Sequence, residues 1–131
     1  MDTTTPAQSA PPPAATEDKT VAIISYITIL GFIVAIIIHS GKKTRLGAYH
    51  LRQVLGLILT IFVVGMVLSV LGFILLFIPF MHLLMIPLDM FVGVAFFVLW
   101  LMGLIAALNG EMKPMPLVGE AFQKWFGTTF D

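Results

Sequence analysis

The sequence contains no cysteine. Disulfide bonds, thiolate metal sites and cysteine nucleophiles are therefore excluded, and the redox compartment stays undetermined. Charged residues are also scarce: they make up 11% of the 131 residues, against about 25% in a typical soluble domain. The seven basic and seven acidic side chains cancel, so no excess of one sign attracts nucleic acid or acidic substrates. We expect no nucleic-acid partner.

Hydrophobic residues dominate what remains, at 59% of the chain. The core of one soluble domain of this length cannot hide that much apolar surface. Most of the chain therefore has lipid as its solvent. In lipid every backbone polar group must be bonded within the protein, which favours helices. The sequence predicts an all-α integral membrane protein, with the lipid bilayer as its first partner.

Three apolar stretches have the length of a membrane-spanning helix. Residues 21–39 carry no Asp, Glu, Lys or Arg, and as a helix they would extend about 28 Å, close to the ~30 Å of a bilayer core. Residues 54–78 and 88–108 are the second and third stretches. Between them, residues 79–87 are too few to cross, so we expect a turn, a short helix at the membrane surface or a re-entrant dip. The sequence predicts a bundle of three transmembrane helices.

A four-helix alternative divides residues 54–87 into two spans of about 17 residues, near the lower length limit. No polar turn marks such a cut. This alternative would also place Lys113 and Lys124 outside, so three helices are favoured.

The flanking segments differ in composition from membrane helices. Residues 1–19 are rich in Pro, Ala and Thr and have no hydrophobic face, which predicts a disordered tail. Residues 117–126 place apolar side chains at spacings of three and four, with Glu120 and Lys124 between them. This pattern is typical of an amphipathic helix at the membrane interface, with Trp125 as an aromatic anchor. Residues 20–127 would then form one membrane domain.

The basic side chains indicate the orientation in the membrane. Six of the seven lie between the first and second spans or after the third, namely Lys42, Lys43, Arg45, Arg52, Lys113 and Lys124. With three spans these two regions share one side, which the positive-inside rule assigns to the cytoplasm. We therefore expect the N-terminus outside and the C-terminus in the cytoplasm.

The segment "TRLGAYHLRQ" at residues 44–53 concentrates polar side chains between two apolar stretches. On a helix, Tyr49, Arg52 and Gln53 share one face, and His50 lies on a neighbouring stripe. Two interpretations stay open. In the first, Arg52 extends to lipid phosphates while Tyr49 and His50 sit in the interface. In the second, Arg52 and Gln53 turn inward and bond other helices, for instance at Asn109.

Two sequence boxes carry a family resemblance. The first, within "AYHLRQVLGL", is an aromatic-His-x-Arg-Gln pattern formed by Tyr49, His50, Arg52 and Gln53. The second, within "LIAALNGEMKPMPLVGEAFQKWF", is formed by Asn109, Gly110, Pro114, Pro116 and Gly119. Over residues 19–127 the chain resembles a family of small uncharacterised bacterial membrane proteins that is distantly similar to the chloroplast inner-envelope import component of the Tic complex. The bacterial family implies no established activity, and the likeness to the plant component suggests a translocon-like role in the bacterial inner membrane. Tyr49 stands where the family more often has Phe, and the plant relatives have four helices.

No motif for catalysis is present: the sequence has neither a phosphate loop nor a Ser-His-Asp set. His39, His50 and His82 show no ligand spacing, so we expect no metal and no cofactor. The sequence predicts a non-enzymatic structural or assembly subunit that acts through helix packing and a polar network of the two boxes at the cytoplasmic face. Small residues at helical spacing, such as Gly103 and Ala107, suit packing within the monomer or a homodimer face, and other membrane proteins are further candidate partners. The alternative is a small channel or transporter, which ion flux in proteoliposomes would reveal.

Overall fold

The computed structural model describes residues 18–131, and within this range the regular elements are all helices. In chain order they are α1 (Thr20–Ile24), α2 (Ile29–Gly41), α3 (Arg45–Leu75), the 3-10 helix η3 (Met81–Leu84), α4 (Met85–Leu108) and α5 (Gly119–Phe126). The prediction of an all-α fold is confirmed for these residues. The predicted disordered tail falls almost entirely outside them.

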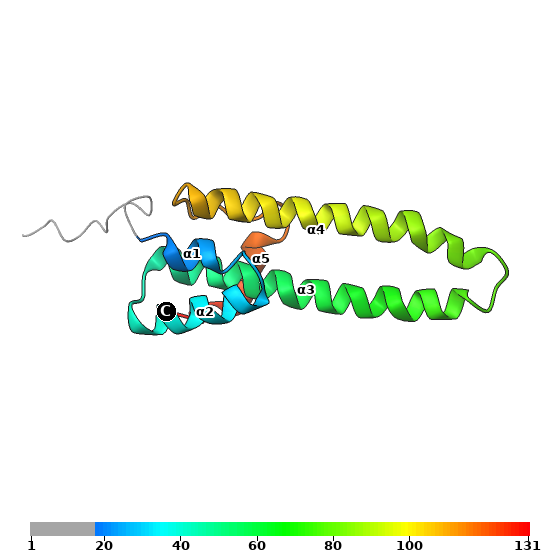
Figure 1. The fold of residues 1–131 in the computed structure, drawn as a ribbon, viewed down its shortest axis with the longest axis horizontal. Coiled ribbons are helices and arrows are strands. Elements are labelled where there is room, and N and C mark those ends of the chain that lie inside the picture. The colour runs from blue at the N-terminus through cyan, green and yellow to red at the C-terminus, as the bar shows by residue number, and fades with distance from the viewer. Residues whose placement is uncertain (1–17) are drawn as a thin grey trace, which may run out of the picture.

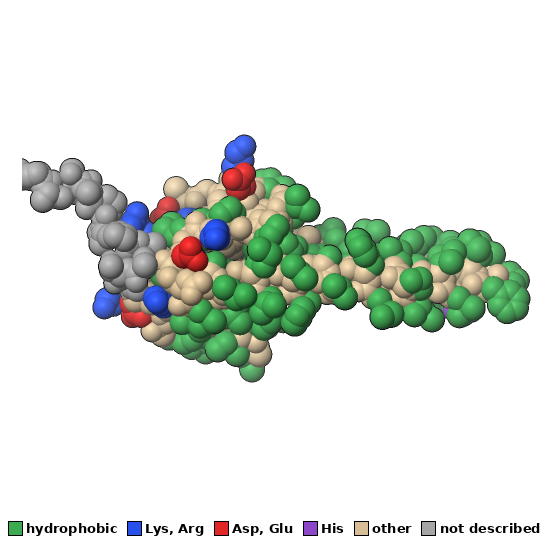
Figure 2. All heavy atoms as spheres, turned by 90° about the horizontal axis from the view of Figure 1, so that it is seen from above, with side chains coloured by type: hydrophobic (Ala, Val, Ile, Leu, Met, Phe, Trp, Pro, Cys, Tyr) green, Lys and Arg blue, Asp and Glu red, His purple; other side chains and the backbone are tan. Residues whose placement is uncertain are grey.

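A long antiparallel hairpin of α3 and α4 forms the frame of the molecule (Figure 1). At 31 and 24 residues, the two helices extend about 46 and 36 Å, enough to cross a bilayer core of ~30 Å. The outer half of the hairpin is covered almost entirely by hydrophobic side chains (Figure 2). Phe91 on α4, for example, is 74% exposed. Such a surface is suited to lipid contact, and α3 and α4 both meet the length and hydropathy expected of a membrane span.

The connection at the tip of the hairpin differs slightly from the predicted one. Helix α3 ends at Leu75, and α4 begins at Met85, before the predicted start at residue 88. Pro87 therefore lies inside the first turn of α4. Backbone N–H groups in the first turn have no acceptor within the helix, so the N–H that proline lacks costs α4 no hydrogen bond. Phe80 adopts a left-handed backbone conformation with φ of 63° and leads into η3.

The first predicted span is wrong as a single helix. Residues 21–39 are divided between α1 and α2 by a break over residues 25–28. Thr28 begins α2 as its N-cap, because its side chain accepts a hydrogen bond from the Gly31 N–H at 3.0 Å. The reversal is tight: a Cβ at Gly31 would lie 2.6 Å from the Ile24 carbonyl oxygen. Helix α2 has 13 residues and extends about 20 Å, too short to cross the membrane, so the count of three spans is not confirmed.

This reversal brings both ends of the described chain to the same end of the hairpin (Figure 1). Lys19 Nζ donates to the Leu108 carbonyl at 3.2 Å, so α1 begins beside the end of α4. Just before it, the Asp18 carboxylate accepts hydrogen bonds from the Thr20 hydroxyl and N–H, and these bonds lower the pKa of Asp18. The predicted placement of the two termini on opposite sides of the membrane is therefore not supported.

The packed core lies at this end, where α1, α2 and α5 surround the first half of α3 (Figure 1). Phe122 of α5 is buried against Gly56 of α3, where an added Cβ would lie 2.3 Å from the ring. Gly103 of α4 has a similar contact with Tyr26, at 2.6 Å. The predicted close approach through small residues thus occurs within the monomer at Gly103. Gly65, in the outer half of α3, has no neighbouring atom within 4 Å of such a Cβ.

Candidate functional site

The polar segment at residues 44–53 is helical rather than a connection. The Thr44 side chain accepts a hydrogen bond from the Gly47 N–H at 2.9 Å and caps α3, which begins at Arg45. Helix α3 therefore carries the first sequence box on its first turns, and the box faces the segment that follows α4. We call the hydrogen-bonded residues of α3 (Tyr49, His50, Arg52 and Gln53), together with Tyr26, Gln123 and the backbone of residues 111–115, the polar clamp.

His50 bridges two other parts of the chain from a fully buried position. Its Nε2 lies 2.8 Å from the Glu111 carbonyl oxygen, and its Nδ1 lies 2.8 Å from the Tyr26 hydroxyl. A carbonyl can only accept, so Nε2 carries the proton. In the neutral ring Nδ1 then accepts from Tyr26. The Tyr26 carbonyl, left free by the break after α1, accepts from Trp100 Nε1 at 2.6 Å. The α1–α2 turn is therefore fixed to both α3 and α4.

Gln53 satisfies the backbone of the extended segment after α4. Its Oε1 accepts from the Met115 N–H at 2.6 Å, and its Nε2 donates to the Lys113 carbonyl at 3.2 Å. Pro114 and Pro116 keep this segment out of a helix, so its backbone groups need outside partners. Gly119 leaves the space for this contact, because a Cβ there would lie 2.6 Å from Gln53 Oε1.

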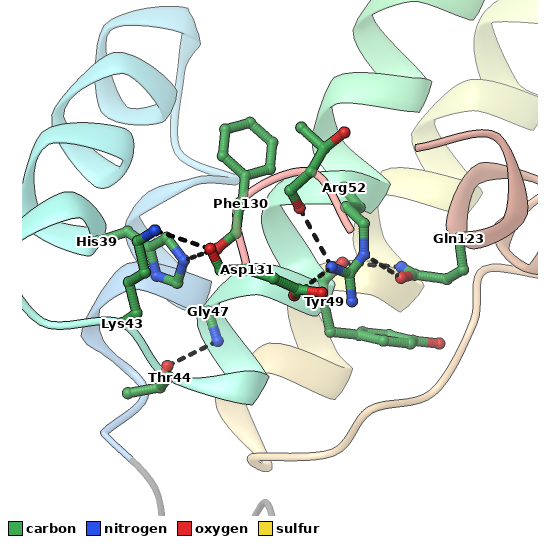
Figure 3. Close-up of polar contacts among 10 residues, drawn as sticks. His39, Lys43, Thr44, Gly47, Tyr49, Arg52, Gln123, Phe130 and Asp131 are labelled. Carbon is green, nitrogen blue, oxygen red and sulfur yellow. Dashed lines mark hydrogen bonds and ion pairs between the residues drawn. The ribbon is translucent and has the colours of Figure 1, made fainter. Parts of the chain in front are cut away.

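Arg52 connects α3 to α5 and to the last residues of the chain (Figure 3). Its Nε donates to Gln123 Oε1 at 2.7 Å, and the Gln123 amide in turn donates to the Tyr49 carbonyl at 2.8 Å. One guanidinium nitrogen donates to the Thr129 carbonyl at 3.2 Å and forms an ion pair with Asp131 at 2.8 Å. Of the two interpretations of this segment, these contacts agree with the one in which Arg52 and Gln53 turn inward and bond other parts of the protein.

The second sequence box meets the first mainly through its backbone. Asn109 is exposed and its amide contacts Glu111 at 3.4 Å, so the expected bond between Asn109 and Arg52 or Gln53 is not formed. Gly110 has φ of 70°, a left-handed conformation that ends α4 and redirects the chain. Pro114 and Pro116 shape the extended segment.

Several partners in the clamp were missed by sequence reasoning. Gln123 is the clearest case: it is a polar residue next to the apolar face of the amphipathic helix, and that position was its only signal. The backbone carbonyls of Glu111 and Lys113 carry no signal in the sequence. The hydrogen bonds of the clamp fasten segments that lie far apart in the sequence to one another. Within residues 18–131, no group of three or more His, Asp or Glu converges to hold a metal ion.

Fold and site together define an integral membrane protein: a lipid-facing helical hairpin with a hydrogen-bonded polar platform at one end. Residues 17–122 match the magnetosome magnetite crystal formation protein family (MamF/MmsF), and the chain belongs to this family. No curated protein and no solved structure matches it. The family match corrects the resemblance to the Tic import component, because both sequence boxes lie inside the matched region. The translocon-like role implied by that resemblance has no support.

Proposed function

We propose that this chain is a non-enzymatic structural subunit of a magnetosome membrane that supports magnetite crystal formation. The family match supplies the process. The observation that carries the structural role is the polar clamp, which fastens residues 111–115 and α5 to the charged end of the hairpin through His50, Arg52 and Gln53. The hairpin is the anchor, and the clamped end is the platform on which other components assemble.

The distribution of charge supports a topology with two spans. Lys19, beside the end of α4, joins the other six basic residues at the broad end of the molecule. Figure 2 shows the Lys and Arg side chains of the visible face gathered there. For a hairpin with its basic residues on one side, the positive-inside rule favours the cytoplasm for that side. In this proposal α3 and α4 cross the bilayer, and both ends of the described chain face the cytoplasm.

The outer half of the hairpin is the surface available to neighbours inside the membrane. Most of its exposed side chains are apolar, as in Phe62, Phe73 and Phe91, although Ser69, His82 and Asp89 are exposed there too. Lipid covers this surface, and helices of other membrane proteins or of a second copy would contact it through the same apolar groups. The platform and the hairpin are therefore separate surfaces, one polar and one apolar.

Complementation of a deletion strain tests this function. Cells that lack the protein should form magnetite crystals of altered size or number, and the wild-type chain should restore them. Gln53→Met, which disrupts the clamp, should restore them poorly when immunoblots of the membrane fraction confirm equal protein levels. Asn109→Ala changes an exposed residue of the second box and is the matched control. Unchanged crystals in the deletion strain would refute the role in crystal formation, and full rescue by Gln53→Met would refute the role of the clamp.

A further inference from the structure

An apolar groove runs along α3 next to helix α5. One wall is the face of α3 from Gly56 to Val64, and the other is formed by Trp125 and Phe126 of α5. The groove has a volume of about 400 Å³, and none of the described residues that line it is charged. The polar clamp does not use this space. We call it the α3–α5 groove.

The groove has the direction and the length of a lipid chain. In the proposed topology α3 crosses the membrane, so a groove along its surface lies roughly parallel to the acyl chains of the surrounding lipid. The stretch of α3 from Gly56 to Val64 is about 12 Å long, and one leaflet of the bilayer core is about 15 Å thick. A chain that enters from one leaflet therefore fits along this stretch.

The position of α5 places one end of the groove near the membrane surface. On one side of α5 lies the polar clamp, in which Arg52 donates to Gln123. On the other side begins the outer half of α3, where Val63 is 58% exposed. Helix α5 thus lies at the boundary between the polar platform and the lipid-facing hairpin. The groove opens on the lipid side of this boundary and is continuous with the apolar surface of the hairpin.

Trp125 gives this end of the groove both apolar and polar character. Its ring packs against the buried ring of Phe122, with the ring centroids 6.0 Å apart, and this contact supports the indole beside α3. Trp125 is nevertheless 71% exposed, and its Nε1–H has no acceptor within residues 18–131. A tryptophan at the membrane interface places its ring among lipid chains and its N–H toward polar groups. A phospholipid offers both, through its acyl chain and its ester carbonyls.

We propose that the α3–α5 groove binds one acyl chain of a phospholipid of the cytoplasmic leaflet, with the lipid ester groups beside the Trp125 indole. The chain leaves other lipid chains rather than water, so close packing drives its binding. Walls from two helices give the chain more contacts than the convex surface of one helix does. The proposal rests on the membrane crossing of α3 in the proposed function, and it does not depend on the role in crystal formation.

Native mass spectrometry tests this proposal on the full chain, purified in a neutral detergent and titrated with phosphatidylcholine, whose headgroup has no net charge. Val63→Phe places a larger side chain in the groove. Val67→Phe is the matched control, because it makes the same change one turn further along α3, at a residue that is 61% exposed and does not line the groove. Trp125→Ala removes part of the other wall and gives a second, independent perturbation.

We expect the wild type to bind one phosphatidylcholine per chain in a saturable manner. Val63→Phe should weaken this binding by about fivefold or more, which is the effect of overfilling a packed site. Trp125→Ala should also weaken it, whereas Val67→Phe should change it by less than about twofold.

Equal losses in Val63→Phe and Val67→Phe would overturn the proposal, since only general contact with lipid would then operate. A dimer in place of the lipid-bound monomer would assign the groove to a second copy of the chain and would overturn it too. If the wild type bound no lipid, the groove site would be refuted. The membrane crossing and the role in crystal formation would still stand, because cysteine labelling and complementation test them separately.

Discussion

Replacing Gln53 by Met is the most direct test of the polar clamp. Both side chains are unbranched at Cβ and Cγ and similar in length, so Met fills most of the buried space but offers neither the acceptor nor the donor of the amide. The Met115 N–H and the Lys113 carbonyl then lose their partners. A buried backbone group without a partner costs about 1–3 kcal/mol, and the Lys113 carbonyl, which is partly accessible, costs less. We expect the free energy of unfolding to fall by about 2–4 kcal/mol.

Two measurements check this value at different scales. Equilibrium unfolding of the detergent-solubilised protein reports the global loss. Hydrogen exchange with mass spectrometry reports the local one, because the Met115 N–H is protected by Gln53 alone among the described contacts. We expect faster exchange over residues 111–118, and little change over the outer half of α3.

Asn109→Ala is the control for this experiment. Asn109 is exposed and its contact with Glu111 is long, at 3.4 Å. Its replacement should change the free energy of unfolding by no more than ~0.5 kcal/mol. If Gln53→Met and Asn109→Ala had the same effect, or if exchange over residues 111–118 stayed slow, the reasoning that Gln53 holds this segment would be refuted.

Three further predictions concern packing, charge and topology. Arg52→Ala should lower stability in detergent more than Lys42→Ala, by about 1–3 kcal/mol, because it removes charge-assisted bonds to α5 and the C-terminal segment; equal losses would count against the inward position of the guanidinium. Gly56→Ala should lower the thermal midpoint because its Cβ would collide with the α5 ring, while Gly65→Ala should leave it unchanged; similar midpoints would contradict that contact. The absence of native cysteine allows single-cysteine labelling, and Lys19→Cys and Lys42→Cys should react from the same side of the membrane; labelling from opposite sides would restore the three-span topology.

The long apolar helices could be predicted from the sequence because their signal is local. Residues 88–108 are apolar and continuous, and they form most of α4. The amphipathic spacing over residues 117–126 likewise predicted α5, although Leu117 falls outside the helix with φ of 70°. Hydropathy and spacing determine such elements without reference to the rest of the fold.

The break within residues 21–39 could not be predicted in the same way. Thr28 is one polar residue in an apolar run, and in a membrane helix its hydroxyl can bond its own backbone instead of capping a new helix. Trp100 of α4 favours the break over a continuous helix, because its Nε1 donates to the Tyr26 carbonyl that the break leaves without a helical partner. Such a contact joins residues far apart in the sequence. The partners of Gln53 could not be predicted for the same reason, because they are backbone groups of a segment far away in the sequence.

The arrangement of the short helices gives the molecule an uneven cross-section. Helices α1, α2 and α5 accompany the α3–α4 pair along only one part of its length, so the protein is broad at one end and narrow at the other (Figures 1 and 2). We expect such a wedge to occupy more area in the leaflet that the short helices reach than in the other. Lipids fill the difference at least cost when the membrane bends, with the crowded leaflet on the convex side. We therefore expect a chain folded in this way to favour a curved membrane over a flat one.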